Sequence, residues 1–164
     1  MRFIESFTPL HLIQHKLAGL SETELHLAPQ GKWSVLQHLY HCWMVERGVL
    51  AYIKLKTQDP SALVPVSVVT RLKFAFFFVA LRVGVLKIKA PDVVQQFPLE
   101  MSTADLMSKW EKTRSQADAF FLDFPEHDAK KGIFKHVFIG RINKKLTQQF
   151  LRLHLRHHLR ICRL

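Results

Sequence analysis

Residues 150–161 read Phe-Leu-Arg-Leu-His-Leu-Arg-His-His-Leu-Arg-Ile, a stretch from which both the fold class and the candidate site can be argued. Consecutive residues of an α-helix are turned by about 100°, so His154 and His158 lie about 40° apart, one turn above the other. The neighbouring apolar residues on that side are Phe150, Leu151, Ile161 and Cys162. The opposite side carries four arginines that we expect to be exposed: Arg152, Arg156, Arg160 and Arg163. The pattern predicts an amphipathic helix with a histidine pair on its buried or cleft-facing side.

The rest of the chain also has helical periodicity. Gly (6) and Pro (7) are sparse, which favours long helices over many short strands. Ser34 and Gln37 have the spacing of a capping box, which marks a helix start. Helices are expected over residues 3–19, 34–56, 66–88, 103–124 and 144–162, with a polar loop at 126–143. The expected fold class is therefore all-α: a four-helix bundle with an additional short helical segment, in one domain covering residues 1–164.

Composition excludes several classes of protein. With 48% hydrophobic residues the chain can form a core, but its most apolar run, residues 74–81, is far shorter than the roughly 20 residues of a membrane span. Residues 1–17 interrupt their apolar pattern with charges, unlike a signal peptide, and two cysteines are too few for a disulfide framework. We therefore expect a soluble, cytoplasmic protein with no transmembrane segment. The net charge of +11 suits nucleic acid, anionic lipid, an anionic substrate or a solvated surface, and does not choose among them.

Two imidazoles one helical turn apart can chelate a divalent cation, but a catalytic site usually has three protein ligands. The helix expected at 34–56 offers two candidates for the third ligand, His38 and His41. Three other residues are alternative metal ligands. His11 and His15 stand at i and i+4 in the first expected helix, and Cys162 lies near the chain end.

A family resemblance selects among these donors. Residues 31–41 read Gly-Lys-Trp-Ser-Val-Leu-Gln-His-Leu-Tyr-His, and residues 135–158 lead from a loop histidine to His-Leu-Arg-His-His. Both stretches, with the connector at 87–91, resemble the DinB-like metalloprotein superfamily. Its members begin their second helix with Lys-Trp-Ser and place a metal-binding His eight residues after that Trp, which corresponds here to His41. The family's H-x-x-x-H helix corresponds to His154 and His158. One departure is Val137, where relatives often carry Pro.

The resemblance implies an up-down-down-up bundle that binds one divalent metal ion (Zn, Ni, Fe or Mn) through His41, His154 and His158, with further metal positions open. Some relatives are bacillithiol or mycothiol S-transferases, and one branch isomerises maleylpyruvate. A low-molecular-weight thiol cofactor is therefore one implication. The family name refers to induction by DNA damage and is not a reason to expect DNA binding. No nucleic-acid partner is expected.

Two functions remain open at this point. One is a metal-dependent enzyme, of thiol S-transferase or hydrolase type, that acts on a small-molecule substrate, which the basic charge suggests is anionic. Against it, no carboxylate shares a helix face with the three histidines, and Glu46 lies about 140° round the helix from His41. The alternative is a non-catalytic metal-binding or interaction domain. In that case the Phe-rich stretch at 74–81 would serve a homodimer interface or an anionic partner or membrane surface, although an ordinary core role is favoured for it.

Overall fold

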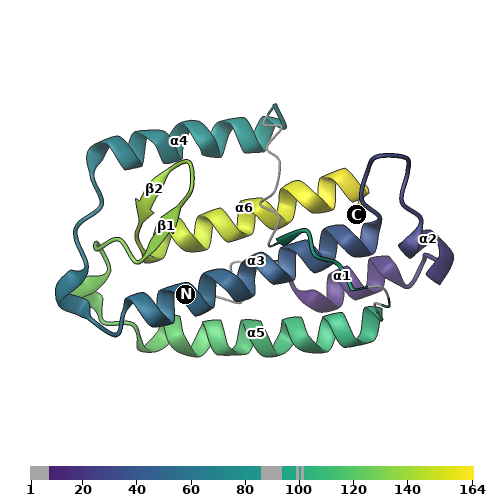
Figure 1. The fold of residues 1–164 in the computed structure, drawn as a ribbon, viewed down its shortest axis with the longest axis horizontal. Helices are drawn as coiled ribbons and strands as arrows, with labels where there is room; N and C mark the ends of the chain where they lie inside the picture. The colour runs from purple at the N-terminus through teal and green to yellow at the C-terminus, as the bar shows by residue number, and fades with distance from the viewer. Residues whose placement is uncertain (1–7, 86–93, 99, 101) are drawn as a thin grey trace.

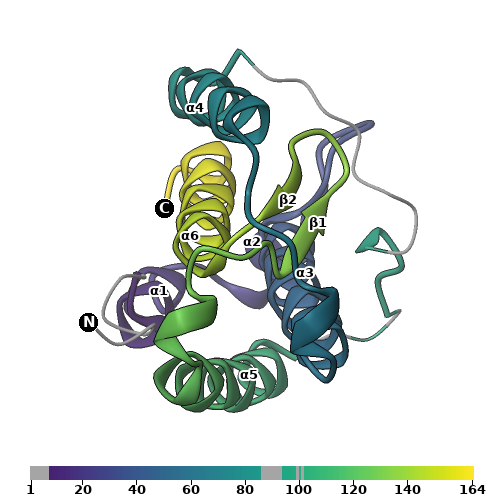
Figure 2. The same ribbon diagram turned by 90° about the vertical axis from the view of Figure 1, so that its left-hand side faces the viewer.

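Four helices form the bundle in the structure, a computed structural model that describes residues 8–85, 94–98, 100 and 102–164. They are α1 (Leu10–Leu17), α3 (Val35–Lys56), α5 (Thr103–Asp123) and α6 (Lys144–Cys162). In Figure 1, α1 and α6 run in one direction and α3 and α5 in the other, which is the up-down-down-up order. The long connection from α3 to α5 contains α4 (Val68–Val83), which packs against the outside of α6 (Figure 2). The expected all-α class and helical bundle are confirmed.

The helix ends follow from local chemistry. The expected capping box is present at α3: the Ser34 hydroxyl accepts from the Gln37 amide at 3.2 Å, and the Gln37 side chain accepts from the Ser34 amide at 2.8 Å. The α4 helix ends at Val83, earlier than the expected residue 88, because Gly84 adopts a left-handed φ of 80°. Residues 3–7 of the first expected helix and residues 86–88 lie outside the described residues.

The shorter elements differ from the sequence-based expectation. A second capping box, between Ser21 and Glu24, begins a five-residue helix, α2 (Glu22–His26), that periodicity alone does not reveal. The prediction that residues 126–143 form a polar loop is wrong in part. This segment holds two 3-residue strands, β1 (Phe134–His136) and β2 (Gly140–Ile142), paired antiparallel, after the turn η4 (Glu126–Asp128). Ile133, Ile139 and Ile142 are buried, so burial of these isoleucines holds the hairpin against the bundle.

An arginine of α6, Arg160, joins this helix to α4. The Arg160 guanidinium donates to the carbonyl oxygens of Arg82, at 2.7 Å, and Leu81, at 3.3 Å, which are among the last carbonyls of α4. A positive charge there also complements the negative end of the helix dipole. Arg156, Arg160 and Arg163 are exposed as expected, and Arg152 is half-buried. The helical phasing that placed the arginines opposite the histidine pair therefore holds.

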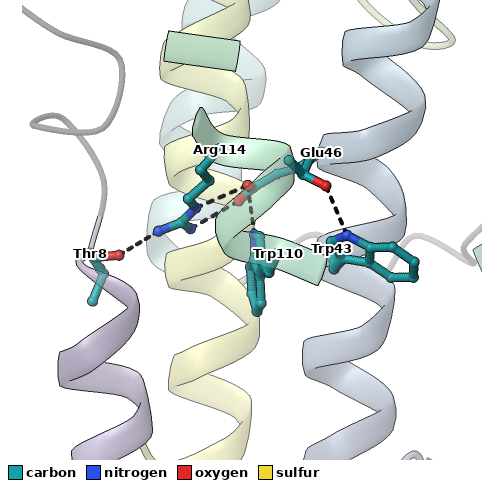
Figure 3. Close-up of polar contacts among 6 residues, drawn as sticks. Thr8, Trp43, Glu46, Trp110 and Arg114 are labelled. Atoms are coloured by element: carbon teal, nitrogen blue, oxygen red, sulfur yellow. Dashed lines mark hydrogen bonds and ion pairs between the residues drawn. The ribbon is translucent and has the colours of Figure 1, made fainter. Parts of the chain in front are cut away.

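A buried polar network joins α3 to α5 (Figure 3). Both carboxylate oxygens of Glu46 accept from the Arg114 guanidinium, at 3.0 and 3.1 Å, and the Trp110 indole donates to the same carboxylate at 2.7 Å. Arg114 also donates to the Thr8 carbonyl at 2.8 Å, just before α1. Glu46 and Arg114 are 4% and 3% exposed, so both charges have lost their hydration, and each is stabilised by the opposite charge of the other. The network fixes how three helices meet.

Among the described residues, no helix is long and apolar enough to cross a lipid bilayer.

We expect Arg114→Leu to lower the free energy of unfolding by about 3–5 kcal/mol, because it leaves a buried carboxylate unpaired. Glu46→Leu/Arg114→Leu should be more stable than that single variant, since no buried charge remains. Urea denaturation followed by circular dichroism measures both. Glu111→Ala, at an exposed position of α5, is the control and should change the free energy of unfolding by less than about 0.5 kcal/mol. A single Arg114 variant as stable as this control would show that the pair does not stabilise the fold.

Candidate metal centre

Three imidazole rings from two helices meet between α3 and α6. His41 comes from α3, and His154 and His158 come from successive turns of α6. The His154 Nε2 atom lies 3.1 Å from Nε2 of His41 and 3.2 Å from Nε2 of His158. One ring nitrogen from each of the three residues lies within 4.8 Å of the others, and no other such group of three donors is found among the described residues. The structure thus brings together the three histidines singled out by the resemblance.

The hydrogen bond on the far side of His41 determines its tautomer. Its Nδ1 lies 3.0 Å from the carbonyl oxygen of Val94, an atom that can only accept. A neutral His41 therefore carries its proton on Nδ1 and directs the lone pair of Nε2 toward the other two rings. Orientation of a histidine by a backbone carbonyl is a common arrangement behind metal ligands.

The three inner nitrogens cannot all be satisfied by hydrogen bonds to one another. His154 Nε2 is part of both short contacts, yet a neutral imidazole nitrogen offers either one proton or one lone pair. If His154 donates to His41, it has no second proton for His158. A cation placed among the three nitrogens would accept all three lone pairs at once. The donor set therefore fits a divalent metal ion better than it fits a hydrogen-bonded cluster.

Burial keeps these rings in the neutral form that can bind a metal. Burial lowers the pKa of His158 far below its ordinary value, and the neighbouring His154 and His41 lower it further. Burial is also the main cause of the lowered pKa of His154 and of His41. Only a neutral ring has a lone pair to donate, so no proton has to be displaced at neutral pH.

A family comparison agrees with this geometry. The family model of the DinB superfamily matches residues 10–162. The chain belongs to the DinB superfamily. None of the curated proteins and none of the solved structures gives a significant match. Membership accounts for the helical bundle, and it leaves the chemistry of the three-histidine group open.

Aromatic rings cover one side of the histidine cluster in this DinB bundle. The Trp33 ring centroid lies 5.0 Å from that of His41, and the same indole is nearly parallel to the His158 ring at 6.3 Å. His38 closes the same side, with its Nδ1 at 2.9 Å from Nδ1 of His158. Burial lowers the pKa of His38 to about 4. His38 thus supports His158 from behind, as a positioning neighbour of the group.

A cavity of about 1060 Å³ adjoins the cluster, between α3, α4, α6 and the hairpin. Most of its wall is apolar, including Met44, Val49, Phe77, Leu81, Phe134 and Phe150. Its polar wall groups, beyond the three histidines, include His38, His136, His157, Lys135, Tyr52 and Arg160. None of the described residues that line it is a carboxylate.

His136 is a wall residue whose importance spacing alone does not reveal. Its Nδ1 accepts from the Phe138 amide at 3.2 Å, so the neutral ring carries its proton on Nε2. Phe77 and Phe150 pack against the ring at 5.0 and 4.6 Å between centroids, and burial lowers its pKa to about 4. His136 thus places a fixed N–H donor in a wall that is otherwise mostly apolar.

The competing donors lie elsewhere. His11 and His15 are exposed on α1, and Cys162 is half-buried outside the three-histidine group, with its pKa raised by burial to about 11. The side chain of Gln37, one turn before His41, is engaged in the cap of α3. Glu46 is bound to Arg114 on the far side of α3.

We expect the metal-free protein to lose stability as the pH falls from 7.5 to 5.0. The pKa of His136 is about 4 in the folded chain and about 6.5 when unfolded, so between these values the unfolded chain binds more protons. The contribution of His136 to the free energy of unfolding is complete above about pH 6.5 and is smaller by roughly 2 kcal/mol at pH 5. Urea denaturation in the presence of chelator measures this loss.

His136→Asn, whose side-chain oxygen can still accept from the Phe138 amide, should show a correspondingly smaller loss between the two pH values. His15→Asn, at an exposed site, is the control and should lose as much stability as the wild type. An equal loss in wild type and His136→Asn would contradict the assignment of His136 as a buried neutral ring.

Proposed function

We propose that His41, His154 and His158 hold one divalent metal ion, and that residues 1–164 form a single-domain, metal-dependent enzyme acting on a small molecule. The observation that carries this proposal is the convergence of three inner ring nitrogens, two of them 3.1 and 3.2 Å from the third, beside a largely apolar cavity. Three imidazoles suit Zn, Ni, Fe or Mn, and they leave further coordination positions for substrate.

When bound, such an ion would lower the pKa of a coordinated thiol or water and polarise a carbonyl group. The chain's own residues have other tasks. The Val94 carbonyl and His38 hold His41 and His158 in place, and Trp33 limits water on one side of the cluster. We infer a thiol S-transferase or a hydrolase, because both reactions need an activated nucleophile next to an apolar substrate pocket.

The cavity wall favours substrates that combine an apolar body with an anionic group. Lys135 and Arg160 line the cavity, while none of its described lining residues carries a negative charge. A carboxylate on a substrate or thiol cofactor would therefore find cationic partners there. With no carboxylate among the described lining residues, the Nε2–H group of His136 is available to donate a hydrogen bond to a substrate oxygen.

A second candidate is a metal-binding domain without catalysis, which is supported by the lack of a carboxylate among the described residues that line the cavity. A hydrolase commonly uses a carboxylate or histidine general base beside its metal-bound water. A thiol transferase does not need such a general base, since metal coordination alone can deprotonate the thiol to the thiolate. The enzyme and the non-catalytic domain would therefore both bind the metal ion, and only the enzyme would turn over a substrate.

We expect His41→Ala, His154→Ala and His158→Ala each to lose most of the bound metal, because two imidazoles bind a divalent ion much more weakly than three. His157→Ala is the matched control, since His157 lines the cavity outside the three-histidine group. Elemental analysis after identical purification measures the metal. The metal-loaded wild type should also gain stability, about 2.7 kcal/mol at a hundredfold excess of metal over its Kd. Equal metal content in all four variants would refute the site.

Turnover separates the enzyme from the binding domain. The metal-loaded wild type should accelerate addition of a low-molecular-weight thiol to an electrophile, or hydrolysis of an activated ester or amide, and the His154→Ala variant should not. Bound metal with no acceleration of either reaction over the His154→Ala variant would support the non-catalytic domain.

A further inference from the structure

The outer face of α4 is apolar and exposed along its whole length. Val69 is 60% exposed, Leu72 66%, Phe76 75%, Val79 58% and Val83 62%. These residues follow one another at spacings of three and four, so they form one stripe along the helix. Isolated exposed hydrophobic side chains are ordinary, but a continuous row marks a surface that is covered in use. We call this row the α4 stripe.

The stripe is additional to the apolar face that α4 uses for packing. Phe74, Ala80 and Leu81 are buried, and Phe77 contacts Phe150 of α6 and His136 of the hairpin. These inner residues meet the needs of the fold. Helix α4 itself lies outside the bundle (Figures 1 and 2), and the side chains of the stripe are exposed. The expectation of an ordinary core role therefore holds for only part of the stretch at 74–81, since Phe76 is 75% exposed.

The ionisable residues of α4 are all basic and flank the stripe. At about 100° per residue the stripe covers an arc of about 80°, with Arg71 and Arg82 beyond one edge and Lys73 beyond the other. All three side chains are exposed. Basic side chains along the edges of an exposed apolar face are typical of helices that lie in the interface of an anionic bilayer, with their charges at the headgroups.

The segments that surround α4 have the same charge character. Residues 60–85 and residues 129–164, which include the hairpin and α6, contain no Asp or Glu. The basic residues of the second segment are Lys130, Lys131, Lys135, Arg141, Lys144, Lys145, Arg152, Arg156, Arg160 and Arg163. Acidic residues such as Asp105, Glu111 and Asp118 belong to α5, which lies at the opposite side of the bundle from α4 (Figure 2).

This charge distribution selects the occupant of the stripe. A second copy of the chain, paired stripe to stripe, would bring Arg71, Lys73 and Arg82 of both copies together without an acidic residue of α4 between them. Lipid phosphates would instead neutralise these charges while the stripe enters the acyl boundary. We propose that the protein lies on anionic membrane surfaces through the α4 stripe. The inference is independent of the metal centre, although α4 also forms one wall of its cavity.

Vesicle binding by the full chain tests this proposal. We expect sedimentation with phosphatidylcholine vesicles containing about 30% phosphatidylglycerol, much weaker binding to phosphatidylcholine alone, and release by high salt. Leu72→Ser/Phe76→Ser should weaken partitioning by about a hundredfold, because each buried side chain contributes roughly tenfold or more. Arg71→Gln/Lys73→Gln should weaken binding to anionic vesicles by roughly 25-fold, at about fivefold per charge.

Leu55→Ser/Leu122→Ser is the matched control, since these side chains are 69% and 72% exposed outside α4. It should bind vesicles like the wild type. Circular dichroism and metal content should be unchanged in every variant, because all the substituted residues are exposed. Wild-type binding that the stripe variant retains would overturn the proposal. A wild type that binds no vesicles would also overturn the proposal. Analytical ultracentrifugation would then show whether the wild type is a monomer, or a dimer that the Leu72→Ser/Phe76→Ser substitutions dissociate.

Discussion

The buried pair of Glu46 and Arg114 constrains the position of α3, and the other features of the bundle depend on that position. Sliding α3 by one turn, about 5.4 Å, would leave a carboxylate, a guanidinium and the Trp110 indole buried without partners. The pair therefore specifies both the height and the rotation of α3. His41 lies about 140° round the same helix and faces α6 as a result. The Glu46–Arg114 pair takes no part in the candidate chemistry, yet it orients the His41 imidazole toward the other two histidines.

The sequence contains most of what is needed to place those imidazoles. The alternation of leucine, arginine and histidine in 150–161 predicts a helix with His154 and His158 one turn apart, and the arginines emerge on the expected side. The Ser34–Gln37 cap fixes where α3 begins, and so fixes the phase of His41 along it. The choice of His41 over His38 rests on the family motif, since both belong to the same helix. In the structure His38 contacts His158 from behind, which is why helical geometry could not separate the two.

Other features come from contacts between residues distant in the sequence, and these could not be read from local patterns. The Val94 carbonyl that orients His41 is a backbone atom, so no side-chain type signals it. The hairpin after α5 is too short to show a strand period, and its place depends on burial of Ile133 and Ile142. The tautomer of His136 follows from the Phe138 amide within that hairpin. The exposed and buried phenylalanines of α4 look alike in sequence, and only the packing of α4 on α6 separates Phe76 from Phe74.

The unequal distribution of charge gives the molecule a permanent electrical asymmetry. One side of the bundle carries basic residues with no acidic ones in the same segments, while α5 on the other side mixes both signs. Such an asymmetry acts like a large dipole, which turns the protein in the field of a negatively charged body before the two touch. At physiological ionic strength this torque acts over about 8 Å. The protein would therefore approach any polyanion with α4 and α6 leading, so orientation precedes contact and unproductive encounters through α5 become rare.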